Sequence, residues 1–323
     1  MKNSNYNKIA KKVIDIEINS LKKLKSNLNI SFEKSVKTIL SCKNGKIIIS
    51  GVGKSGIIGK KIASTLSSVG TPSFFVDASS CSHGDLGQIS SNDVLILISY
   101  SGDSSELKNI IQYAKRNKII LIGIMSKKKS LLYKASEIKL LIPEVKEADP
   151  NNIVPTSSTI IQLSIGDALA VATMKYKKFT KLDFKKFHPS GSLGAKLKTV
   201  EDLMLTGNKI PFVKENILMK DALKIIVKKK LGTLIVKNKK GFTCGILVDG
   251  DIKRSSQKID NLKTVEIRKI MKKNPISVNR ETLAAEALSI MNLKKVTSLC
   301  VHDRNKKKTI GIIHIHNILQ SNI

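Results

Sequence analysis

The run IIISGVGKSG at residues 47–56 indicates the fold class of this 323-residue chain. Its isoleucines predict a short buried strand, and the glycines at 51, 53 and 56 predict a tight turn. The helical apolar pattern of residues 57–69 follows at once. A strand, a small-residue turn and a helix in this order are typical of sheets whose parallel strands are joined by helices.

The same order recurs along the first half of the chain. VLILIS at residues 94–99 predicts another buried strand, followed by a serine-rich turn at 100–105 and a helix to Arg116. Further strands are expected at 73–76, 119–125 and 138–142, and a long helix at 157–175. We therefore predict an α/β domain at residues 45–185, with a parallel five-stranded sheet covered by helices on both faces. A helical segment at residues 1–44 precedes it.

The second half of the chain repeats itself. EDLM at 201–204 is echoed by RKIM at 268–271, and GIL at 245–247 by GII at 311–313, at offsets of 67 and 66 residues. A steady offset predicts two copies of one supersecondary unit, here with helix, strand, strand and helix in order. The expected boundaries are a linker at 186–202 that carries His188, then small α+β modules at 203–262 and 268–323.

The lysine-rich composition gives a formal net charge of +32, which raises the question of a nucleic-acid partner. Only five of the 57 basic residues are arginine, although arginine predominates in contacts with phosphates and bases. Lysines spread along the whole chain beside many isoleucines and asparagines are typical of an AT-rich coding bias. We therefore expect no nucleic-acid partner, although the charge can speed the encounter with an anionic substrate.

The apolar patterning also bears on location. No apolar run approaches the roughly 18 residues of a membrane span, and residues 1–12 lead into no apolar stretch. We therefore expect no membrane association and no secretory signal. The four cysteines form no close pair, so reduced thiols in a cytoplasmic protein are the simplest interpretation.

Two turns that follow strands have the composition of phosphate-binding loops. GVGKSG at 51–56 is not a Walker A loop, because Ile48 stands where that motif requires glycine. Free backbone N–H groups at the start of the next helix could still bind a phosphate. The second turn, YSGDSSE at 100–106, follows Ser99 and adds further hydroxyls. Helix capping accounts for one serine but not for a cluster, so phosphate binding is favoured here.

Three more polar segments lie outside the regular elements. They are HGDLG with His83, EVKEADP with Glu147, and HPSGSLG with His188. Each has a plain structural interpretation: a histidine that only packs, a solvated acidic loop, and a hinge between domains. Taken one at a time, none of them identifies a reaction.

The motifs taken together resemble one family. GVGKSG, GTPSFFV, HGDLG, SGDSSE, KEADP, PTSST, GDALA and FHPSGSLG occur in that order over residues 51–194. The chain resembles the D-arabinose 5-phosphate isomerases, which have a sugar isomerase (SIS) domain followed by two cystathionine-β-synthase (CBS) modules. The resemblance implies an SIS sandwich plus a tandem CBS pair, and it is weakest over the first 40 residues.

The resemblance also implies the site. The family's catalytic positions fall on Lys54, Glu106, Glu147 and His188. Its substrate contacts fall on His83, Gly70 and Thr71, and its phosphate-binding positions on Ser55, Ser99, Ser101 and Ser104. A homotetramer is implied as well, because in related isomerases one site histidine comes from a neighbouring subunit.

The implied reaction interconverts D-ribulose 5-phosphate and D-arabinose 5-phosphate through an enediolate, early in 3-deoxy-D-manno-octulosonate and lipopolysaccharide synthesis. A buried glutamate can remove the carbon-bound proton, and either Glu147 or Glu106 could be this base, with Glu147 favoured. Lys54 would stabilise the oxyanion or the phosphate. His188 would open a cyclic substrate or move a proton between oxygens. No cofactor is required.

The chain departs from the family pattern at several positions. Tyr100 stands where the family usually has Asn, and Asp103 replaces Glu. Asp77 stands where some members have a zinc-binding histidine; with Cys81 and His83 it could still ligate a metal, although we expect none.

The CBS modules depart from the family pattern too. The hydroxyl residue that often binds nucleotide is Val248 in one copy and His314 in the other. The ribose-binding Asp is kept as Asp251 but is Asn317 in the second copy. A packing or assembly role is therefore favoured over nucleotide binding.

Two other functions stay open. The chain could be an SIS isomerase that acts on a different sugar phosphate. It could also be a non-catalytic sugar-phosphate sensor whose CBS pair relays the ligand state to a partner. Sensors of that kind usually carry a helix-turn-helix, and residues 1–44 are too short for one plus the first helix of the domain.

Overall fold

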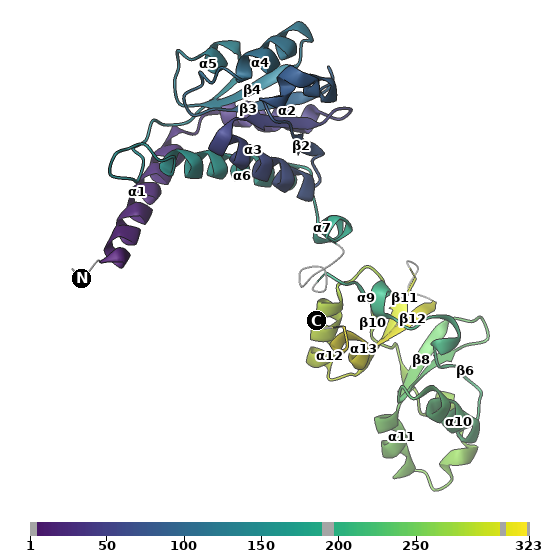
Figure 1. Cartoon of the computed structure of the whole chain (residues 1–323). Coiled ribbons are helices and arrows are strands. Elements are labelled where there is room, and N and C mark those ends of the chain that lie inside the picture. The colour runs from purple at the N-terminus through teal and green to yellow at the C-terminus, as the bar shows by residue number, and fades with distance from the viewer. Residues whose placement is uncertain (1–4, 189–196, 304–307, 322–323) are drawn as a thin grey trace. The chain divides into compact units, whose positions relative to one another are not determined.

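The computed structural model describes residues 5–188, 197–303 and 308–321. Its contacts divide the chain into two compact units, Met1–Phe184 and Lys185–Ile323, which are coloured purple to teal and teal to yellow in Figure 1. The division falls inside helix α7 (Lys181–Phe187). Of the predicted linker at 186–202, residues 189–196 lie outside the described part of the chain.

The first unit is built on one parallel sheet of five strands. They are β1 (Ile47–Gly51), β2 (Ser73–Phe75), β3 (Val94–Ile98), β4 (Ile120–Met125) and β5 (Ile138–Leu141). They lie in the order β2-β1-β3-β4-β5, and every neighbouring pair is parallel. The predicted five-stranded α/β fold is confirmed.

Alternate strand residues pack on opposite faces of this sheet. On β1, Ile47 and Ile49 belong to one apolar cluster, whereas Ile48 belongs to the other. Helices α1 (Tyr6–Asn27), α2 (Ile30–Ser41), α3 (Gly53–Ser68) and α6 (Ser157–Tyr176) contribute to the first cluster, and α4 (Leu107–Arg116) and α5 (Leu131–Ala135) to the second. Because both faces are covered, the strands read as continuous apolar runs rather than as alternating ones.

The strand order reverses direction between β1 and β3. The chain leaves β1 through α3 on one face and leaves β3 through α4 on the other (Figure 1). Gly51 pairs with Ile98 in the register of these strands, so the turns that follow them start side by side. Sheets of this kind bind ligands at such a point, outside the carboxyl ends of the strands.

The second unit contains two repeats with the order strand, helix, strand, strand, helix. The first consists of β6 (Phe212–Lys214), α10 (Met219–Lys229), β7 (Thr233–Lys237), β8 (Thr243–Val248) and α11 (Asp249–Ser256). The second consists of β10 (Ser277–Asn279), α12 (Ala284–Lys294), β11 (Ser298–His302), β12 (Thr309–His314) and α13 (Ile315–Leu319). The predicted repeat is present, with a short first strand in each copy that the sequence did not reveal.

The segment that leads into one repeat pairs with a strand of the other repeat. Leu205, just after α9 (Val200–Leu203), bridges to Ile312 of the second repeat. In the same way β9 (Lys272–Lys273) pairs with β8 of the first repeat. The echoed methionines follow this exchange, because Met204 packs against Gly311 and Met271 against Gly245. The two modules therefore pack together as one unit rather than as two independent domains.

Within the described ranges, no helix is both long and apolar enough to cross a membrane.

Candidate functional site

The turn between β1 and α3 brings Lys54 and Ser55 to the carboxyl edge of the sheet. Helix α3 begins at Gly53, four residues earlier than the sequence pattern suggested, so Lys54 and Ser55 lie in its first turn. A Cβ on Gly56 would lie 2.8 Å from the Gly51 carbonyl oxygen. Glycine is therefore required here, because the helix starts directly against the end of the strand. Lys54 is exposed and makes no ion pair with the described part of the chain.

The turn after β3 is organised by its own serines. The buried Ser99 Oγ accepts a hydrogen bond from the Gly102 N–H at 3.0 Å and lies 3.0 Å from Ser104 Oγ. Gly102 has a φ of +74°, which favours glycine. The more exposed Ser101 Oγ accepts from the Asp103 N–H. Hydroxyls and backbone donors are thus gathered next to the β1–α3 turn, as phosphate binding requires.

Glu147 lies on the loop between β5 and α6 and is only 8% exposed. Its Oε2 accepts hydrogen bonds from the Thr156 N–H at 2.8 Å, the Thr156 hydroxyl at 3.1 Å and the Ser158 N–H at 3.2 Å. These donors belong to the start of α6, where a carboxylate is stabilised by unpaired N–H groups and by the helix dipole. No residue in the described ranges donates a hydrogen bond to Oε1. One carboxylate oxygen is fixed, and the other is available.

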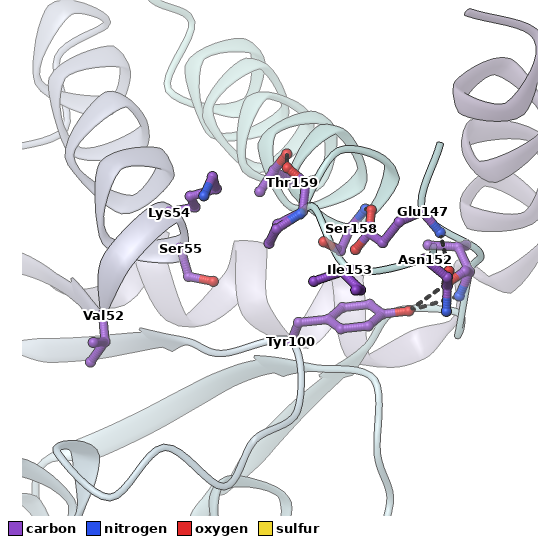
Figure 2. Close-up of a pocket in the computed structure, with 11 residues that line it drawn as sticks. Val52, Lys54, Ser55, Tyr100, Glu147, Asn152, Ile153, Ser158 and Thr159 are labelled. Atoms are coloured by element: carbon purple, nitrogen blue, oxygen red, sulfur yellow. Dashed lines mark hydrogen bonds between the residues drawn. The ribbon is translucent and has the colours of Figure 1, made fainter. Parts of the chain in front are cut away.

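These three segments enclose a pocket of about 450 Å³. Figure 2 shows Lys54 and Ser55 at the start of α3, Glu147 and Asn152 on the opposite side, and the Tyr100 ring between them. The lining residues are Val52, Lys54, Ser55, Tyr100, Val145, Glu147, Asn152, Ile153, Pro155, Ser158 and Thr159. A cation, a carboxylate and several hydroxyls therefore share one cavity of a size that suits a small ligand.

The sequence-predicted site residues are only partly brought together in this cavity. Lys54, Ser55 and Glu147 line it. Ser99, Ser101 and Ser104 form the adjoining turn, and Ser99 and Ser104 face each other.

Glu106 and His83 are placed elsewhere. Glu106 is the exposed N-cap residue of α4, where its Oε2 accepts from the Ser105 hydroxyl. His83 is exposed at the end of the short 3₁₀ helix η1 (Ser80–His83). Neither side chain lines the pocket.

Gly70 and Thr71 are placed apart from the pocket residues in a different way. Gly70 and Thr71 precede β2 and therefore lie at the amino edge of the sheet, opposite to the pocket. Thr71 is buried, and the Lys177 ammonium donates to its hydroxyl at 2.9 Å. His188 follows α7 and belongs to the second unit.

The possible metal ligands Asp77, Cys81 and His83 do not form a cluster. Asp77 Oδ1 accepts from the Ser79 N–H at 2.8 Å. Burial raises the pKa of the Cys81 thiol to about 11, and the carboxylates of Asp85 and Asp77 add to this. Among the residues that the structure describes, no three His, Cys, Asp or Glu side chains come together to hold a metal.

Asn152, Ile153, Ser158 and Thr159 are among the eight pocket residues that were not singled out from the sequence as site residues. The signal for the two hydroxyl residues was present, because a Ser/Thr-rich helix start after an acidic loop predicts donors for a carboxylate. Asn152 has a positive φ of 58° and accepts from the Glu147 N–H at 2.6 Å, a contact that the sequence does not indicate.

Comparison with known proteins agrees with this architecture. The SIS domain model matches residues 39–172, and the CBS domain model matches residues 200–258 and 267–322. The first match contains both turns and Glu147. The second covers both repeats.

Curated relatives extend the similarity over nearly the whole chain. The arabinose 5-phosphate isomerase KdsD of Francisella tularensis is 42% identical over 309 residues, which cover 94% of each chain. That of Yersinia pestis is 39% identical over 319 residues, 98% of this chain and 96% of that one. An Escherichia coli protein solved in complex with arabinose 5-phosphate is 36% identical with a TM-score of 0.56, and the match covers 58% of this chain and all of that one. This chain therefore belongs to the arabinose 5-phosphate isomerase family, with an SIS domain followed by two CBS domains.

Proposed function

We propose that this chain is an aldose–ketose isomerase that interconverts D-ribulose 5-phosphate and D-arabinose 5-phosphate. The observation that carries the proposal is the pocket itself: the Lys54 ammonium and the available Glu147 oxygen line one cavity beside a serine turn. Full-length similarity to arabinose 5-phosphate isomerases supports the choice of substrate. So does a related structure that contains arabinose 5-phosphate.

The serine turn and the start of α3 are the proposed phosphate site. Ser55, Ser99, Ser101 and Ser104 would contribute hydroxyls, together with the N–H groups at the beginning of α3. No arginine is needed, because backbone donors and a helix start bind phosphate well. With the phosphate there, the other end of a five-carbon sugar would reach towards Glu147.

The chemistry needs a base, an acid and stabilisation of an oxyanion. We assign the base to Glu147, whose Oε1 would remove a proton from C1 of the ketose. The C1–H electron pair forms a C1=C2 double bond, and the charge that develops on O2 is stabilised by Lys54. Return of a proton to C2, with transfer of the hydroxyl proton from O1 to O2, gives the aldose. The hydrogen bonds to Oε2 would hold the carboxylate in position for both transfers.

The remaining family positions are assigned by resemblance. His188 would open the cyclic aldose or move the proton between O1 and O2, as its residue type allows. His83, which is exposed, would contact substrate within an assembled homotetramer, whereas Gly70 and Thr71 are substrate contacts by resemblance alone, because Thr71 is buried at the amino edge of the sheet. Glu106 is the alternative base, and its exposed position at the start of α4 favours Glu147 over it. We also propose that the enzyme acts in the cytoplasm.

The test is turnover of ribulose 5-phosphate by the purified full-length chain, followed by NMR of the product. Formation of arabinose 5-phosphate supports the proposal. A different sugar phosphate would instead identify an isomerase of another specificity, and tight binding with no turnover would identify a sensor. Light scattering of the same sample checks the tetramer, which a monomer in solution would contradict.

A further inference from the structure

Tyr100 is the bulkiest side chain in the serine turn, and its backbone is firmly held. Its carbonyl oxygen accepts hydrogen bonds from the Ser126 N–H at 2.9 Å and the Ser126 hydroxyl at 2.7 Å, both at the end of β4. On either side of it, the Ser99 hydroxyl and Gly102 close the turn. The residue therefore starts from a rigid position beside the proposed phosphate site.

The side chain of Tyr100 reaches across the pocket to Val145, in the loop between β5 and α6. The Val145 N–H donates to the phenol oxygen at 2.7 Å, and the phenol O–H lies 3.3 Å from the Val145 carbonyl oxygen, to which it donates. Figure 2 shows the ring lying between the α3 side of the pocket and the Glu147 loop. Burial raises the pKa of this phenol, and the Glu147 and Glu144 carboxylates act in the same direction. The hydroxyl thus stays protonated, with its donor and its acceptor both occupied by Val145.

Val145 lies two residues before Glu147, so its position bears directly on the proposed base. The phenol oxygen is the only acceptor found for the Val145 N–H in the described part of the chain. Beyond Val145, the loop is held by the Glu147 N–H bond to Asn152 and by the α6 donors to the carboxylate. Tyr100 is therefore the link between the serine turn and the start of this loop.

We propose that Tyr100 is a positioning residue that couples the phosphate-binding turn to the loop carrying the base, so that Glu147 meets the substrate in a fixed place. The inference rests on the proposed isomerase function. The phenol does not act as an acid on the substrate, since its hydrogen bonds are made to the backbone. A displacement of about 1 Å at a reacting group can cost about 100-fold in rate. Loss of this link should therefore appear in the chemical step.

The test compares Tyr100→Phe with Tyr113→Phe in the full-length chain. Tyr113 is a matched control on α4, outside the pocket, whose hydroxyl donates to the Ile89 carbonyl oxygen at 3.0 Å. Both variants keep the ring; Tyr100→Phe loses the two hydrogen bonds between the phenol and the Val145 backbone, and Tyr113→Phe loses the one to Ile89. We expect Tyr100→Phe to lower kcat by about 10-fold, with KM within about 2-fold because the ring still lines the pocket. Tyr113→Phe should keep kcat within about 2-fold.

A second readout follows the link itself. Amide hydrogen exchange of the segment around Val145 should speed up in Tyr100→Phe and stay unchanged in Tyr113→Phe. This expectation concerns local opening of the segment and does not depend on the unfolding temperatures of the two variants. Normal kcat in a folded Tyr100→Phe, an equal loss in both variants, or a change in KM alone would each overturn the inference. Absence of arabinose 5-phosphate with the unaltered chain is a separate result, which would overturn the proposed function instead.

Discussion

The two units of this chain use their polar groups in opposite ways. At the carboxyl edge of the first unit, Lys54 makes no ion pair with described residues and Glu147 keeps one oxygen available. In the second unit, Asp251 is buried and its Oδ1 is occupied by Arg254 at 2.5 Å and Lys272 at 3.1 Å. The charged side chains of the pocket form no ion pair within the described part of the chain, whereas Asp251 is paired with two cations, although its Oδ2 is buried without a hydrogen-bond partner there.

The pairing in the second unit follows its internal repeat. Thr233 lies 3.4 Å from Ser298, and the Thr243 hydroxyl lies 2.7 Å from that of Thr309, its counterpart in the other copy. An apolar cluster of Ile210, Ile235, Cys300 and Ile312 contains buried residues of both repeats. The difference between the units predicts that substitutions in the first should change the rate and substitutions in the second should change stability.

The largest expected effect is that of Glu147→Gln. Removal of a general base lowers kcat by about 1,000-fold, within the usual range for such groups. Steady-state assays with ribulose 5-phosphate measure it. Glu144→Gln, an exposed carboxylate on the same loop, is the control and should keep normal turnover. Equal activity of Glu147→Gln and the unaltered chain would exclude Glu147 as the base.

The second-largest effect is expected for Lys54→Met, whose kcat should be about 100-fold lower than that of the unaltered chain. The expected cause is loss of the charge that stabilises the developing oxyanion. Lys115→Met, an exposed lysine in the last turn of α4, is the control for the general effect of removing one positive charge. A rise in KM with unchanged kcat would place Lys54 at the phosphate instead.

In the second unit, Ile312→Ala should lower stability rather than rate. Ile312 is fully buried, and truncation of such a side chain destabilises a protein by about 2 kcal/mol or more. We expect a lower unfolding midpoint in urea and a kcat within about 2-fold of normal at 25 °C. A selective loss of kcat in the folded variant would show that this cluster contributes to the site. That result would contradict the expectation that substitutions in the second unit change stability and not rate.

The smallest expected effect concerns pH and Asp251. Burial alone would raise the pKa of this carboxyl, but the hydrogen bonds from Arg254 and Lys272 outweigh it and hold the pKa below its ordinary value. A lowered pKa contributes stability above the ordinary carboxyl range, and this contribution is lost as the pH falls through the lowered value.

Asp251→Asn should therefore be about 1 kcal/mol less stable than the unaltered chain at pH 7. The difference should shrink as the pH falls below about 4. Urea unfolding at both pH values measures it. A difference that grows on acidification would contradict the sign.

Much of the fold could be predicted from the sequence because its signals are local. A run such as VLILI is buried on both faces and cannot be mistaken for a surface strand. The short strands β6 and β10 were missed, since three residues carry no periodicity. The start of α3 was placed too late, because Gly53 and Gly56 are poor helix formers whose place is set by packing against β1.

The site was harder to predict because two glutamates meet the same criterion for a candidate base, namely a position after the carboxyl end of a strand. Glu106 and Glu147 both follow strands of the sheet, and their spacing does not show which one faces the cavity. Tertiary contacts make the difference: the start of α6 fixes Glu147, whereas Glu106 stands at the N-cap position of α4 without a capping hydrogen bond and faces solvent. Nor does the sequence show that Tyr100 reaches Val145, since these residues come from different loops.

The most direct test of the account is isomerisation of ribulose 5-phosphate in D₂O, followed by NMR. Proton transfer through Glu147 predicts deuterium at C2 of the arabinose 5-phosphate in those turnovers in which the proton on the carboxyl exchanges with solvent before it is returned. It also predicts a far slower incorporation of deuterium with Glu147→Gln. Turnover and deuterium incorporation by Glu147→Gln at the normal rate would contradict the assignment of this carboxylate as the base.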